Sequence, residues 1–108
     1  KNSGINPMMA KTLDITPENL QIVQQILQQH IPHYPVWAFG SRTKGTAKPY
    51  SDLDLAVITT EALPLAVHAD LVDAFSESEL PWKVDIVDWQ LISEDFRSII
   101  AAHYLILQ

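Results

Sequence analysis

The sequence predicts a single α/β domain of the α+β kind, in which helices pack on a small mixed sheet of three or four strands. Helix-like and strand-like segments alternate along the chain, and the loops between them are short. The chain has 108 residues, of which 47% are hydrophobic and 19% charged, so it has room for one core. We expect residues 1–10 to form a flexible N-terminal tail and residues 11–108 to form the domain.

The first helix is expected over residues 17–30. Thr16 is a favourable N-cap, and Pro17 suits the first helical position. The apolar residues that follow recur at the spacing of an amphipathic helix, and two prolines soon after residue 30 end the pattern.

Three strands are expected, over residues 36–40, 53–58 and 83–89. Each is a short run rich in β-branched, aromatic or other apolar residues. The segment between the first two, residues 41–51, contains two turn formers and three basic residues, so we expect a loop there.

Two further helices complete the predicted order of elements. The second helix covers residues 66–76, with Pro64 near its start. The third begins after Ser93 as N-cap, with two acidic residues in its first turn, and extends to include Tyr104.

Composition excludes several classes of function. The chain has no cysteine, which excludes disulfides, thiolate zinc sites and thiol nucleophiles, and we expect it to be cytoplasmic. Thirteen acidic against seven basic residues give a net charge of -6, so direct nucleic-acid binding is not expected. No apolar run is long enough for a membrane helix, so we expect no membrane partner.

Carboxylates on two of the expected strands predict a metal site. Asp52 and Asp54 are two residues apart in an apolar run, so both should point to the same side of the strand. Asp85, on the next strand along the chain, would complete a set of hard oxygen ligands, which favours Mg²⁺ or Mn²⁺ over Zn²⁺. Asp88 competes with Asp85 for this role, because it also has apolar neighbours, and the two would point to opposite faces of a regular strand. The pattern alone leaves both candidates open, and the alternative explanation of Asp88 is a solvated carboxylate at the strand end.

A second feature predicts phosphate binding. Gly40 lets the backbone approach a ligand, and the N–H groups and hydroxyl of the following Ser41 can hold phosphate oxygens. Arg42 and Lys44 follow directly, and basic residues here suit the charge of a triphosphate beside a metal cluster. Lys48 is more readily explained as part of a charged solvent loop.

Together these residues resemble a known family. Gly40-Ser41, a gap of ten residues, Asp52-x-Asp54 with apolar flanks, and Asp85 on a later strand are similar to the motif of nucleotidyltransferases related to DNA polymerase β. The short chain and the string GSRTKGTAKPYSDLDLAV resemble, in particular, the minimal nucleotidyltransferase antitoxins encoded beside HEPN-domain toxins.

The resemblance implies a polymerase β-like fold and a role for each motif residue. Gly40 and Ser41 would contact the triphosphate of ATP, and Asp52 and Asp54 would ligate two Mg²⁺ ions. Asp85 would be the third metal ligand and would help to deprotonate the attacking hydroxyl. Arg42 and Lys44 would neutralise charge on the leaving group.

The implied function is that of an antitoxin which transfers AMP from ATP to a tyrosine of a cognate HEPN ribonuclease toxin and so neutralises it. Two alternatives stay open. One is a small-molecule nucleotidyltransferase of the aminoglycoside type, although the chain lacks a helical substrate domain. The other is a non-catalytic antitoxin that masks the toxin by binding alone.

Overall fold

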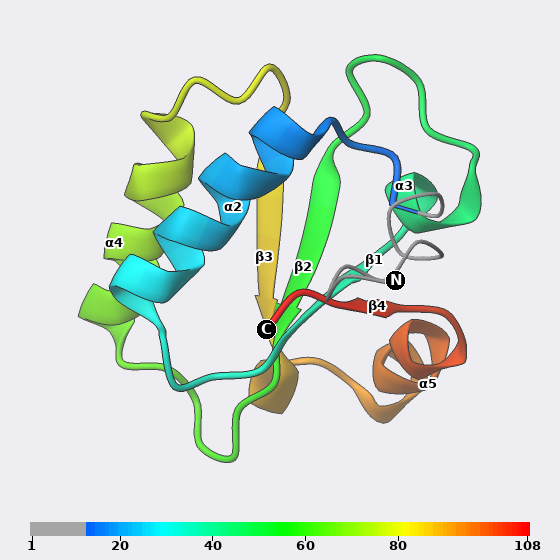
Figure 1. Cartoon of the computed structure of the whole chain (residues 1–108). Coiled ribbons are helices and arrows are strands. Elements are labelled where there is room, and N and C mark those ends of the chain that lie inside the picture. Colours follow the sequence, from blue (N-terminus) through cyan, green and yellow to red (C-terminus); the bar gives the residue numbers. More distant parts are fainter. Residues whose placement is uncertain (1–12) are drawn as a thin grey trace, which may run out of the picture.

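The computed structural model describes residues 13–108 (Figure 1). The expected tail, residues 1–10, lies outside the described residues. In chain order the described elements are α2 (Pro17–His30), β1 (Val36–Phe39), α3 (Ser41–Lys44), β2 (Leu53–Val57), α4 (Leu65–Ser76), β3 (Val84–Asp88), the 3₁₀ turn η1 (Trp89–Leu91), α5 (Glu94–Ala102) and β4 (Leu105–Ile106).

The strands of the described chain form one four-stranded mixed sheet in the order β3-β2-β1-β4. Strand β1 is antiparallel to both of its neighbours, β2 and β4. Strands β2 and β3 are parallel, and the chain passes from one to the other through α4. The predicted small mixed sheet with helices packed on it is therefore confirmed.

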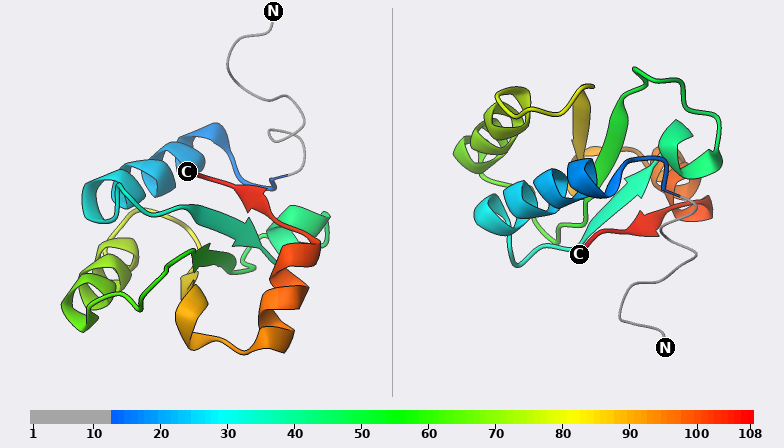
Figure 2. Two further views of the ribbon diagram at one scale, coloured as in Figure 1. Left: turned by 90° about the horizontal axis from the view of Figure 1, so that it is seen from below. Right: turned by 45° about the horizontal axis from the view of Figure 1, so that its top comes forward.

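Helices cover both faces of the sheet (Figure 2). Helices α2 and α4 pack on one face, where the larger core includes Val23, Leu27, Val36, Leu53, Leu55, Val57, Leu71 and Phe75. Helix α5 and η1 pack on the other face, where a smaller cluster includes Phe39, Ala56, Val87, Trp89, Phe96 and Ile100. The site described below lies on this second face.

Two of the predicted helix starts are confirmed by hydrogen bonds. The Thr16 Oγ1 accepts a hydrogen bond from the backbone N–H of Asn19 at 3.1 Å, and the Ser93 Oγ accepts one from Phe96 at 3.1 Å. Each bond satisfies an N–H that the first turn of a helix leaves without a backbone partner.

The end of the chain differs from the prediction. Helix α5 stops at Ala102, so the prediction that Tyr104 lies on this helix was wrong. The Tyr104 ring instead stacks on Trp37 at 3.9 Å between ring centroids, and the two residues that follow it pair with β1 as β4. A strand of two residues has too little pattern to be recognised, and it forms because the antiparallel edge of β1 is available to it.

Asp88 also differs from its expected environment. Its side chain is buried, not solvated, and it lies on the face opposite to Asp85. Its carboxylate accepts hydrogen bonds from the Thr59 hydroxyl at 2.6 Å, from the Leu63 N–H at 2.7 Å and from the Gln90 N–H at 3.0 Å. Asp88 therefore holds the end of β3 to the loop that leads into α4.

None of the helices described within residues 13–108 combines the length and the hydropathy that a membrane-spanning helix needs.

Candidate active site

Strand β2 presents two carboxylates on the face that α5 covers. Leu53 and Leu55 are almost completely buried and belong to the core under α2 and α4. Because side chains alternate along a strand, Asp54 points to the opposite face. Asp52 immediately precedes the strand, and its side chain shares a hydrogen bond with Asp85, which brings it to the same group.

Strand β3 brings the third carboxylate to the same place. Asp85 is the register partner of Asp54 in the parallel pairing of β2 and β3. Adjacent strands are about 4.8 Å apart, so partners in register present their side chains next to each other on one face. Of the two candidates in this strand, Asp85 joins the pair on β2, and Asp88 does not.

The three carboxylates disfavour one another's charge. Partial burial, and then the charges of Asp85 and Asp52, raise the pKa of Asp54 from 3.8 to about 6. Burial, a hydrogen bond with Asp52 and the charge of Asp52 raise the pKa of Asp85, and Lys83 offsets only part of this effect. The group therefore favours a counter-charge.

Lys83 is the basic residue that contacts this group, and sequence reasoning did not single it out. Its Nζ lies 3.7 Å from Asp85 Oδ1, with 74% of the Lys83 side chain exposed. A solvent-exposed pair of this kind contributes little stability, so the lysine can move away from the carboxylate at small cost. The available signal was the spacing: Lys83 is two residues before Asp85 and therefore shares its side of the strand.

Gly40 connects the expected phosphate loop to these carboxylates. It follows β1 and has a φ of +86°, which residues with a side chain rarely adopt. A Cβ at this position would lie 3.2 Å from Asp54 Cγ and would collide with Asp54 Oδ2. Only glycine allows the backbone of this turn to pass so close to the Asp54 carboxylate.

The expected loop after Gly40 contains a one-turn helix, α3, which Ser41 begins. Thr43 fastens it to Gly40, because both its N–H, at 3.0 Å, and its hydroxyl, at 2.7 Å, donate to the Gly40 carbonyl. Gly45 then ends the turn with a φ of +74°. Ser41 is partly exposed beside Gly40, and Lys44 is fully on the surface, so both are accessible to a ligand.

Arg42 lies in a different environment from the one expected of a phosphate contact. Its side chain is only 4% exposed, and its guanidinium donates hydrogen bonds to four backbone carbonyls. These donors are therefore not free to bind the leaving group of a nucleotide. The sequence could not reveal this, because two of the groups that enclose the side chain, Asp14 and Trp82, are far from it in the chain.

Divalent-cation chemistry suits the three aspartates. Carboxylate oxygens are the ligands that Mg²⁺ and Mn²⁺ prefer. Burial and then the neighbouring carboxylates raise the pKa of Asp54 and Asp85, and a bound cation would offset both effects. As they stand, no three potential ligands among residues 13–108 converge closely enough to hold an ion. The side chains at positions 52, 54 and 85 are all partly exposed, so a cation from solvent can reach them.

Two concavities of the described chain lie away from the three carboxylates. One concavity of the described chain runs along the glutamines of α2, and another lies between α4 and the start of β3. Neither is lined by Asp52, Asp54 or Asp85.

Residues 21–107 match the family described as "Polymerase beta, Nucleotidyltransferase". The chain belongs to this family. This nucleotidyltransferase is 58% identical over 96 residues to the "Probable protein adenylyltransferase MntA" of Haemophilus influenzae. The matched region covers 89% of this chain and 84% of that relative. The sequence-based prediction of a polymerase β-like fold is thereby confirmed.

Solved structures share the fold of this nucleotidyltransferase. A crystal structure of a toxin–antitoxin with AMP-PNP has a TM-score of 0.71 and 26% identity, over 83% of this chain and 73% of that chain. A structure of the tri-AMPylated Shewanella oneidensis HEPN toxin in complex with MNT antitoxin has a TM-score of 0.58 and 23% identity, over 82% of this chain and 71% of that chain. The second likeness is one of fold alone.

Proposed function

We propose that this nucleotidyltransferase is a Mg²⁺-dependent protein adenylyltransferase that transfers AMP from ATP to a tyrosine hydroxyl of a cognate HEPN-domain toxin. The transfer would neutralise the toxin, so the chain would act as an antitoxin in the cytoplasm. The observation that carries the proposal is the meeting of Gly40, Asp54 and Asp85 on one face of the sheet. The high identity with an adenylyltransferase named MntA favours a protein as acceptor.

We assign the nucleotide to the turn after β1. The backbone at Gly40 and the hydroxyl of Ser41 would contact the triphosphate, and the exposed Lys44 would offset its charge. Arg42 is no longer among the proposed contacts, because its donors bind backbone carbonyls.

We assign the metal to Asp52, Asp54 and Asp85, with Mn²⁺ as a possible substitute for Mg²⁺. When bound, two such ions supply positive charge that lowers the pKa of an acceptor hydroxyl and stabilises the leaving pyrophosphate. The acceptor oxygen forms a bond to the α-phosphorus, and the bond from that phosphorus to the pyrophosphate oxygen breaks. Asp85, whose side chain is 45% exposed, receives the proton of the hydroxyl.

The exposure of the site suits a macromolecular acceptor. The Asp85 side chain is 45% exposed, and Asp52 and Asp54 are partly exposed, so a hydroxyl carried by another protein can reach them. The net charge of -6 suits a partner with a basic, RNA-binding surface, because complementary charge increases the rate of encounter.

The proposal is tested by separating catalysis from binding. The double variant Asp52→Asn/Asp54→Asn and the unmodified chain are each mixed with a HEPN-domain ribonuclease, ATP and Mg²⁺, and both complex formation and RNA cleavage are measured. We expect both proteins to form the complex and only the unmodified chain to abolish cleavage. Full neutralisation by the double variant would instead show that occlusion alone is sufficient.

A further inference from the structure

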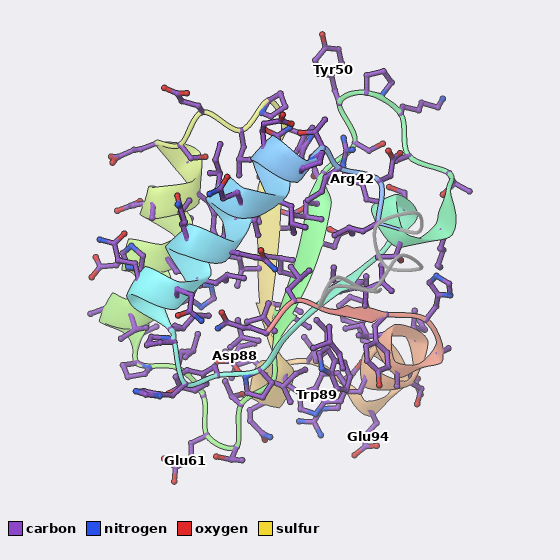
Figure 3. All side chains as sticks on the ribbon, viewed as in Figure 1. Arg42, Tyr50, Glu61, Asp88, Trp89 and Glu94 are labelled. Atoms are coloured by element: carbon purple, nitrogen blue, oxygen red, sulfur yellow. The ribbon has the colours of Figure 1, made fainter. Side chains whose placement is uncertain are left out.

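Arg42 is the most completely enclosed charged side chain of the site region. It points inward from α3, beneath the loop that connects α3 to β2 (Figure 3). Its Nε donates to the Ser51 carbonyl at 2.9 Å, and one of its terminal nitrogens donates to the Asp14 carbonyl at 2.8 Å. The other terminal nitrogen donates to Pro49 at 3.0 Å and to Lys48 at 3.3 Å.

These bonds hold the segment from which the Asp-x-Asp strand starts. Ser51 immediately precedes Asp52, and Lys48 and Pro49 belong to the same turn. The turn is also closed on itself, because the Ser51 N–H donates to the Lys48 carbonyl at 3.0 Å and the Ser51 hydroxyl accepts from the Lys48 N–H at 2.8 Å. Arg42 thus fixes the whole turn against α3.

The same guanidinium also contacts the segment that leads into β3. It stacks on the Trp82 ring at 4.6 Å from the ring centroid. The next residue, Lys83, accepts a hydrogen bond through its carbonyl from the Leu53 N–H at 2.9 Å, where β2 and β3 begin side by side. One side chain therefore contacts the entry to both strands that carry the carboxylates.

We propose that Arg42 is a positioning residue, whose buried guanidinium ties the Lys48–Ser51 turn and Trp82 together and so sets the position of Asp52 relative to Asp54 and Asp85. Its role in catalysis rests on the proposed function. Its role in metal binding rests on the geometry of the three aspartates alone. An arginine is required, because only a planar group with several fixed donors can donate hydrogen bonds to carbonyls in different directions while it stacks on a ring.

The first test compares Arg42→Lys with Arg97→Lys. Arg97 is a matched control, since it also donates to a backbone carbonyl, that of Trp89, and stacks on the Trp89 ring, but it lies on α5. For Arg42→Lys we expect kcat for AMP transfer to fall about 10- to 100-fold, with less than about a 3-fold change in the KM for ATP. For Arg97→Lys we expect both constants to stay within about 2-fold of the unmodified chain.

The second test needs no acceptor and no transfer. Mn²⁺ is titrated into the protein alone, and the free ion is measured by electron paramagnetic resonance. The affinity for Mn²⁺ should be several-fold weaker in Arg42→Lys and unchanged in Arg97→Lys. Trp82→Leu, which removes the stacking partner, should also weaken Mn²⁺ binding, whereas Trp82→Phe should preserve much of it. These variants keep the proposal testable should one of them fold poorly.

Three results would overturn the proposal. A higher KM for ATP with unchanged kcat and Mn²⁺ affinity would make Arg42 a nucleotide contact. Normal Mn²⁺ affinity per folded molecule, with losses of activity that follow thermal stability in both arginine variants, would make its role purely structural. Absence of Mn²⁺ binding by the unmodified chain would remove the site that Arg42 is said to position.

The failure of the proposed function has a different signature. In that case the unmodified chain binds Mn²⁺ but transfers no AMP to the toxin. Weaker Mn²⁺ binding in Arg42→Lys would then still support positioning, and equal binding would still refute it.

Discussion

Asp54 and Asp85 are register partners on adjacent parallel strands, β2 and β3, with Gly40 packed against the Asp54 carboxylate. Two residues that are 31 positions apart in the chain thereby present like charges side by side on one face of the sheet. Such an arrangement costs stability unless a cation compensates it, and this cost leads to the first two predictions.

Asp54→Asn should stabilise the protein in the absence of divalent cations at pH 8. The raised pKa of Asp54, about 6, means that folding disfavours its ionised form. The stability associated with the protonated Asp54 carboxyl is fully present below pH 3.8, the ordinary pKa of the group. It is lost as the pH rises through about 6, the pKa of the group in the folded protein. Since the carboxylate is partly exposed, we expect a gain of about 1 to 2 kcal/mol at pH 8, which disappears near pH 4. Thermal unfolding at both pH values checks this, and a less stable variant at pH 8 would contradict it.

Mg²⁺ or Mn²⁺ should raise the melting temperature of the unmodified chain at pH 8. A ligand that binds only the folded state stabilises it in proportion to the logarithm of its concentration. Asp54→Asn and Asp85→Asn should each show a much smaller increase, because each removes one of the proposed ligands. The measurement is a melting curve across a metal titration at constant ionic strength. Equal shifts in all three proteins would place the bound metal elsewhere.

Gly40→Ala should abolish AMP transfer and destabilise the fold, and Gly45→Ala should only destabilise it. Both glycines have positive φ, so alanine introduces backbone strain of about 1 to 3 kcal/mol at either position. Only at Gly40 would the new Cβ also collide with Asp54, since nothing lies within 4 Å of the corresponding position at Gly45. Denaturant unfolding and transfer assays on the pair check this. Comparable transfer rates in the two variants would refute the role of the Gly40–Asp54 contact.

Asp88→Asn should destabilise the fold by about 1 to 3 kcal/mol at pH 7 while leaving Mn²⁺ binding unchanged. Burial alone would raise the pKa of Asp88, but hydrogen bonds from Thr59, Leu63 and Gln90 outweigh it, with a smaller contribution from His68, and lower the pKa. Its stabilising contribution is therefore present above the ordinary value of 3.8 and is lost as the pH falls through the lowered value. Urea unfolding of the variant against the unmodified chain should show a difference that shrinks at low pH. A loss of Mn²⁺ affinity would mean that Asp88 belongs to the site after all.

Sequence patterns predicted the part of the site that depends on local periodicity. The alternation of Asp52 and Asp54 with buried leucines is fixed within one strand, so a few residues are enough to assign the shared face. Parity separates Asp85 from Asp88 but does not say which face of β3 meets Asp54. The preference for Asp85 came from the resemblance to the nucleotidyltransferase motif, and the register of β2 and β3 places Asp85 beside Asp54.

Features that depend on distant contacts could not be predicted in this way. The burial of Arg42 requires Asp14 and Trp82, which are far from it in the sequence, so its basic side chain looked like a phosphate ligand. The burial of Asp88 requires donors from the loop after β2, and the ordering of Tyr104 requires Trp37 on β1. In each case the tertiary partner, rather than the local pattern, decides the environment of the side chain.

The measurement that tests the central claim most directly is the intact mass of a HEPN-domain toxin after incubation with this chain, ATP and Mg²⁺. We predict mass increments of one or more AMP units, which are absent with EDTA and absent with Asp52→Asn/Asp54→Asn. A stable complex with an unmodified toxin, or increments that persist in the double variant, would contradict catalysis by the carboxylates of β2 and β3.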